Sequence, residues 1–76
     1  MNKIRRKQLA AIQSKIAELQ ELLEELHDEE QEAIDNMPES LWGSDRYEAM
    51  EEAASNIELA IDELGYAADY IEEACA

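Results

Sequence analysis

Apolar residues recur along the first half of the chain at alternating steps of three and four. The row consists of Leu9, Ile12, Ile16, Leu19, Leu23, Leu26, Glu30 and Ala33, with its last two places taken by a charged and a small residue. Such steps place side chains on one face of a helix, and the Gln, Glu, Ala and Leu residues around them favour helix. Because Leu22 and Ile34 widen the row, the face is broad enough for a helical bundle. We predict a helix over residues 2–35.

The second half carries a more regular row, which predicts a second helix over residues 45–75. Its members are Tyr47, Met50, Ala54, Ile57, Ile61, Leu64, Ala68, Ile71 and Cys75. Beside it, alanines recur every seven residues as Ala53, Ala60, Ala67 and Ala74. Small side chains let another helix approach closely, so we interpret this alanine flank as a dimer interface. Gly65 costs about 1 kcal/mol relative to Ala in a helix, and it marks either a close approach or a weak point.

Residues 36–44 separate the two rows and contain the only Pro and the only Trp of the chain. Pro38 disfavours helical geometry at the preceding residue, and Asn36 tolerates the left-handed turn that ends many helices. Ser44 is the preferred cap of the second helix because Asp45 follows it in the first turn. Two long helices joined by this loop predict an all-α antiparallel hairpin of coiled-coil type.

The chain length bears on the oligomeric state. A chain of 76 residues buries only about 60% of the surface that its unfolded form exposes. The single Cys75 cannot cross-link the chain to itself, and no Cys/His pattern predicts structural zinc. We expect one domain that dimerises into an antiparallel four-helix bundle. Leu41 and Trp42 are too apolar for a solvated loop, so we expect them to cover the open end of the core or to contact a partner.

Charge is unevenly distributed along the chain. Five of the six basic residues lie in the first fifteen positions, and all twenty acidic residues follow from Glu18 onward. With one basic and twenty acidic residues, segment 16–76 carries a net charge of 1 − 20 = −19. Such a surface repels nucleic acid and anionic membranes and attracts basic proteins. We expect a protein partner with a basic surface and no direct nucleic-acid or membrane partner.

The basic start also bears on topology and location. In an antiparallel hairpin it would lie beside the acidic end of the second helix, which we interpret as a signal that sets the register. This basic cluster consists of Lys3, Arg5, Arg6 and Lys7. No apolar run of a signal peptide follows it, and no run approaches the roughly 20 apolar residues of a membrane span. We expect a cytoplasmic protein.

Leu59, Tyr66 and Tyr70 are large side chains outside the predicted row of the second helix. Leu59 lies two turns before Tyr66, and Tyr66 lies one turn before Tyr70, so the three share one side of the helix. One interpretation is ordinary exposure, or burial in a different dimer geometry. The other is a partner-binding patch, because tyrosines surrounded by carboxylates suit a basic surface. The candidate partner-binding residues are Leu59, Asp62, Glu63, Tyr66 and Tyr70, together with Trp42 in the loop.

Candidate chemistry is scarce. Glu24 and His27 have the acid-to-histidine spacing of di-iron bundles, with Glu30 following in the row, but twenty acids make this spacing common by chance. The ordinary interpretation is that His27 and Glu30 form a polar pair that sets the helix register, or hydrogen-bond to each other. No glycine-rich phosphate loop is present, and Cys75 lies far along the chain from the only histidine. We predict a non-enzymatic protein without cofactor or metal.

The interhelical stretch carries a resemblance to a known group of proteins. The run Asp35–Glu48 (DNMPESLWGSDRYE), after the opening MNKIRRK, resembles small acidic proteins of phages and prophages of Gram-positive bacteria. The resemblance implies a viral origin and a two-helix fold. Small acidic phage proteins often resemble DNA mimics that inhibit host proteins, so we expect an acidic inhibitor of a host nucleic-acid-handling or defence protein. The alternative is a structural protein that acts only as a self-associating bundle.

Overall fold

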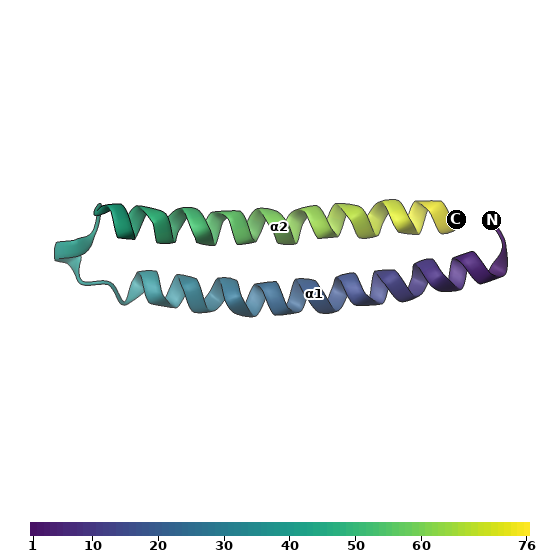
Figure 1. Cartoon of the computed structure of the whole chain (residues 1–76), viewed down its shortest axis with the longest axis horizontal. Coiled ribbons are helices and arrows are strands. Elements are labelled where there is room, and N and C mark those ends of the chain that lie inside the picture. Colours follow the sequence, from purple (N-terminus) through teal and green to yellow (C-terminus); the bar gives the residue numbers. More distant parts are fainter.

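A computed structural model shows residues 1–76 as a two-helix hairpin (Figure 1). Helix α1 spans Lys3–Asp35, helix α2 spans Asp45–Cys75, and the one-turn 3-10 helix η1 spans Glu39–Leu41 between them. The helices run antiparallel, so both termini lie at the same end of a rod that measures 59 × 15 × 12 Å (Figure 1). The predicted all-α hairpin is confirmed.

Each helix begins at a side-chain cap. The Asn2 side chain accepts a hydrogen bond of 2.8 Å from the Arg5 N–H, and the Ser44 hydroxyl accepts one of 3.2 Å from the Tyr47 N–H. These bonds satisfy amides that have no partner within the first turn of a helix. Asp45 adds a negative charge to the first turn of α2, which the helix dipole favours. The predicted Ser44 cap is confirmed.

The chain leaves α1 without a left-handed residue at Asn36. That residue has φ −87°, and its N–H donates to the Glu32 carbonyl at 3.0 Å, so the helical hydrogen-bond pattern continues into the cap. The positive φ of +81° occurs at Gly43 instead, where the missing Cβ makes this geometry accessible. Asn36 nevertheless ends α1 as its C-cap, which confirms the predicted helix stop, and the left-handed geometry that asparagine tolerates is not used there.

Trp42 lies at the tip of the hairpin. Its indole Nε1 donates to the Met37 carbonyl at 3.0 Å, and its ring centroid lies 6.4 Å from that of Tyr47. Leu41 and Trp42 both remain about half exposed, so they do not seal the end of the core, which was one of our two expectations for them. Trp42 instead hydrogen-bonds within the loop and places its ring beside Tyr47 in the first turn of α2.

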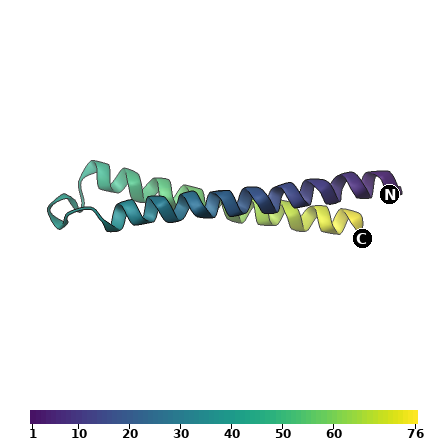
Figure 2. The same ribbon diagram turned by 90° about the horizontal axis from the view of Figure 1, so that it is seen from below.

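The seam between the helices uses the predicted row of α2 in full. All nine of its residues are buried or half-buried. Figure 2 shows the two helices crossing at a shallow angle, as coiled-coil packing produces. The core is thin, because only Ile16, Ile34 and Ala54 are fully buried.

Only four of the eight residues in the predicted row of α1 lie at the seam. Leu9, Ile16, Leu23 and Glu30 are at least half-buried, as predicted, but the seam positions that alternate with them hold Gln13, Gln20, His27 and Ile34. The displaced members Ile12, Leu19 and Leu26 are 45% to 52% exposed. The physical reason lies in two hydrogen bonds, because the side-chain amides of Gln13 and Gln20 donate to the α2 carbonyls of Ala68 at 3.0 Å and Ile61 at 3.2 Å.

Candidate functional site

The outer side of α2 presents the candidate partner-binding strip. Leu59, Tyr66 and Tyr70 are 56%, 59% and 72% exposed, and they point away from the seam with helical spacing. Asp62 and Glu63 are exposed between them. The structure therefore brings these five candidate residues together on one surface of a single helix.

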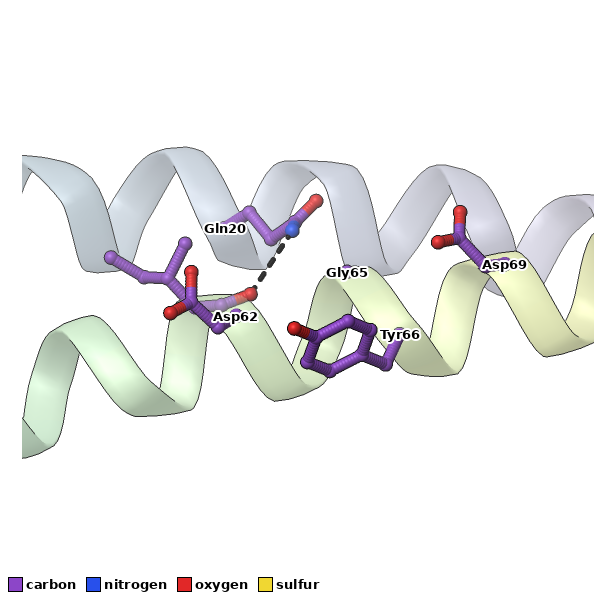
Figure 3. Close-up of a pocket in the computed structure, with 6 residues that line it drawn as sticks. Gln20, Asp62, Gly65, Tyr66 and Asp69 are labelled. Carbon is purple, nitrogen blue, oxygen red and sulfur yellow. Dashed lines mark hydrogen bonds between the residues drawn. The ribbon is translucent and has the colours of Figure 1, made fainter.

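A shallow hollow of about 270 Å³ adjoins the strip on the side facing α1 (Figure 3). Its lining residues are Gln20, Ile61, Asp62, Gly65, Tyr66 and Asp69. Gly65 helps to form the hollow because it has no side chain, and an added Cβ would lie 3.3 Å from Gln20 Nε2. Two carboxylates and a phenol around this space can receive a basic side chain.

Sequence reasoning missed Gln20 as a member of this surface. Gln20 belongs to α1, and its place against Gly65 depends on which side of α1 faces α2 (Figure 3). Gly65 was the one signal available, because a glycine inside a helix has either a packing reason or a cost in stability. The structure favours the packing reason.

Trp42 does not join the strip. It lies in the loop before α2, whereas Leu59 lies fourteen residues into that helix, about 20 Å along its axis. Its exposed ring therefore forms a separate surface at the hairpin tip, next to Tyr47. The structure leaves it as an independent contact point rather than as part of one continuous binding site.

The predicted dimer flank stays uncovered. Ala53, Ala60 and Ala74 are exposed, and Ala67 is half-buried. Because α1 does not pack on these methyl groups, the hairpin leaves free the side of α2 that the sequence marks for close helix approach.

The predicted pairing of opposite charges across the hairpin does not form. Among the basic side chains only that of His27 lies within 4.0 Å of a carboxylate, with Nδ1 3.6 Å from Asp28 and Nε2 4.0 Å from Glu58. The cluster Lys3, Arg5, Arg6 and Lys7 has no acidic partner within its own hairpin. These side chains are exposed, and an exposed pair gains only about 0 to 1 kcal/mol, which is too little to hold two long side chains together.

The weaker metal hypothesis receives no geometric support. No group of three or more His, Cys, Asp or Glu side chains is placed to hold a metal ion. His27 contacts Asp28 and Glu58 rather than Glu24 or Glu30. The predicted hydrogen bond between His27 and Glu30 is therefore absent, although both side chains are half-buried at the seam.

Two further findings concern the chain as a whole. Neither helix contains a segment long and apolar enough to cross a membrane. Comparison with protein-family models, curated proteins and solved structures finds no match to this chain. We therefore infer function from the charge, exposure and geometry of the surface itself.

Proposed function

We propose that this chain is a non-enzymatic protein-binding module that engages a basic protein surface through the outer side of α2. The observation that carries the proposal is the exposure of Leu59, Tyr66 and Tyr70 within a segment of net charge −19, in which one basic residue stands against twenty acidic ones. Aromatic residues are enriched at the centres of protein interfaces. Carboxylates around them favour a partner of opposite charge.

The length of α2 supports this mode of binding. Its 31 residues extend about 45 Å, which is long enough to lie along a groove that otherwise holds nucleic acid. The exposed acids along it are Glu48, Glu51, Glu52, Glu58, Asp62, Glu63, Asp69, Glu72 and Glu73. Their field would speed the encounter with a basic partner, while the dry contacts of the tyrosines would provide specificity.

The resemblance to phage proteins supplies the class of partner. Under this proposal the chain acts in the host cytoplasm, where it inhibits a nucleic-acid-handling or defence protein by occupying its basic channel. The carboxylates then stand in for phosphate groups, and the chain itself does not bind nucleic acid.

Affinity capture from a Gram-positive bacterial lysate tests the proposal. Three immobilised proteins are compared at moderate salt: the wild type, a strip variant with Leu59, Tyr66 and Tyr70 changed to Ser, and a control with the exposed Ile4 and Leu22 changed to Ser. The wild type and the control should retain the same basic protein, and duplex DNA should release it. Retention of no basic protein, or equal retention by the strip variant, would contradict the proposal.

The second candidate function is a self-associating bundle, in which two hairpins form an antiparallel four-helix homodimer. The observation in its favour is the thin core, with three buried residues among 76, beside the uncovered alanine flank. If self-association is the whole function, the strip variant keeps both its oligomeric state and its biological effect. Sedimentation equilibrium tests the dimer, which would have twice the chain mass of 8.7 kDa.

A further inference from the structure

Two uncovered rows of the hairpin have equivalent positions relative to the seam. On α1, Ile12, Leu19 and Leu26 each come directly before a seam residue that is followed by the next one after three positions. On α2, Ala53, Ala60 and Ala67 do the same, and Ala74 continues their spacing of seven residues. In an antiparallel helix pair, residues in this equivalent position lie on the same side of both helices. The two rows therefore form one continuous surface, which we call the apolar face: Ile12, Leu19, Leu26, Ala53, Ala60, Ala67 and Ala74.

The hydrogen bonds across the seam give the register of this face. Gln13 bonds to Ala68 and Gln20 to Ile61, pairs whose residue numbers add to 81, whereas Gln20 against Gly65 and His27 beside Glu58 add to 85. Residues whose numbers add to about 81 to 85 therefore lie near the same level, which places Leu19 level with positions 62–66, between Ala60 and Ala67. Ile12 and Leu26 likewise come level with the next gaps in the alanine row. Each large side chain of α1 thus stands at the height of a space between two small ones on α2.

We infer that a second copy of the chain covers the apolar face, with the loops of both hairpins at the same end. This inference rests on the proposed self-association and specifies its geometry. A two-fold axis parallel to the helices keeps every residue at its own level and places α1 of one protomer over α2 of its partner. Leu19 of one protomer then enters the gap between the partner's Ala60 and the partner's Ala67. Large side chains fill small-residue gaps on both sides of the axis.

The exposed area of the hairpin is sufficient for such a dimer. The chain exposes 5917 Å², whereas a folded monomer of 8.7 kDa scales to about 4,700 Å². The apolar face is about 30 Å long and two helices wide, or roughly 600 Å² per protomer. Covering this face on both copies would bury about 1,200 Å² of accessible surface in total, which reaches the lower limit for specific, stable interfaces.

The mass and the arrangement can be measured separately. Sedimentation equilibrium should give a dimer for the wild type and for Leu59→Glu, and a dissociation constant raised at least ~100-fold for Leu19→Glu, because a buried charge in each half of the interface has no partner. Leu19 and Leu59 are similarly exposed, at 50% and 56%, so the two variants differ mainly in the face they alter. Ala60→Trp, which fills a gap, provides a second variant should Leu19→Glu lose helix content by circular dichroism.

A spin label on the only cysteine, Cys75, reports the arrangement. With the loops together the two labels lie under about 25 Å apart, whereas loops at opposite ends would separate them by about 35 Å along the bundle. Monomeric wild type would overturn both the proposed self-association and this inference. A wild-type dimer that resists Leu19→Glu and Ala60→Trp, or that shows the long distance, would overturn the inference alone.

Discussion

At the scale of single residues, Gln20 and Gly65 contact each other across the seam between the helices. The Gln20 amide donates to the Ile61 carbonyl at 3.2 Å, and a Cβ on Gly65 would lie 3.3 Å from the same nitrogen (Figure 3). That separation is shorter than ordinary van der Waals contact, so the amide would have to move. Glycine lowers the helix propensity at position 65, but its small size leaves room for the hydrogen bond from Gln20 to the Ile61 carbonyl.

A double-mutant cycle measures how far the Gln20 hydrogen bond offsets the lower helix propensity of Gly65. Gly65→Ala should gain about 1 kcal/mol of helix propensity in a Gln20→Ala background. In the wild type the gain should be smaller, because displacing the amide loses a hydrogen bond of about 1 kcal/mol. Urea denaturation of the four proteins at one concentration gives the coupling. Equal effects of Gly65→Ala in both backgrounds would show that the contact contributes nothing.

The polar seam residues explain why sequence reasoning placed α1 only in part. A count of apolar spacing selects Ile12 and Leu19, since it gives no weight to polar residues. The structure turns Gln13 and Gln20 inward because their amides find backbone carbonyls on α2, which removes the cost of burying them. The spacing of residues along one helix gives no information about which backbone carbonyls of another helix will be available as hydrogen-bond acceptors.

At the scale of the elements, α2 was the predictable helix. Its row from Tyr47 to Cys75 contains no competing polar residue at a seam position, so its apolar spacing alone identifies the buried side. Its start was predictable as well, because Ser44 is followed by Asp45 and accepts the expected hydrogen bond. The strip at Tyr66 and Tyr70 was predictable from the same spacing, because these two residues fall outside the seam positions.

Removing the cap of α2 should weaken the fold measurably. Ser44→Ala deletes the acceptor for the Tyr47 N–H and should lower the free energy of unfolding by about 1 kcal/mol, within the usual range of 0.5 to 2. Ser40→Ala is the matched control, since Ser40 lies in η1 and caps no helix. Urea midpoints compare the two proteins. Equal destabilisation by both changes would mean that the loop sequence, rather than the cap, starts α2.

At the scale of the whole molecule, charge opposes folding. The chain carries −14 at pH 7 on a rod only 15 Å and 12 Å across, and His27 is the one basic side chain within 4.0 Å of a carboxylate. Carboxylates on neighbouring turns therefore repel one another within about a Debye length. A basic partner that neutralises this charge would bind and stabilise the hairpin at the same time.

Salt should consequently stabilise the isolated protein. Raising NaCl from ~0.05 to ~0.5 M shortens the Debye length to a few ångströms and should raise the melting temperature by about 5 °C, equivalent to roughly 1 kcal/mol. Lowering the pH toward the isoelectric point of about 4.1 acts in the same direction, because protonation removes negative charge. Thermal unfolding followed by circular dichroism gives both dependences. A melting temperature that falls with added salt would contradict the role given to repulsion.

Binding through the outer side of α2 is tested most directly by the tyrosines, of which the chain has three. With 3-fluorotyrosine incorporated, ¹⁹F NMR resolves one signal each for Tyr47, Tyr66 and Tyr70. Addition of the captured basic protein should shift or broaden the signals of the exposed Tyr66 and Tyr70, and leave that of the half-buried Tyr47 beside Trp42 nearly unchanged. A change confined to Tyr47 would place the contact at the hairpin tip, and unchanged Tyr66 and Tyr70 signals at saturation would contradict the account.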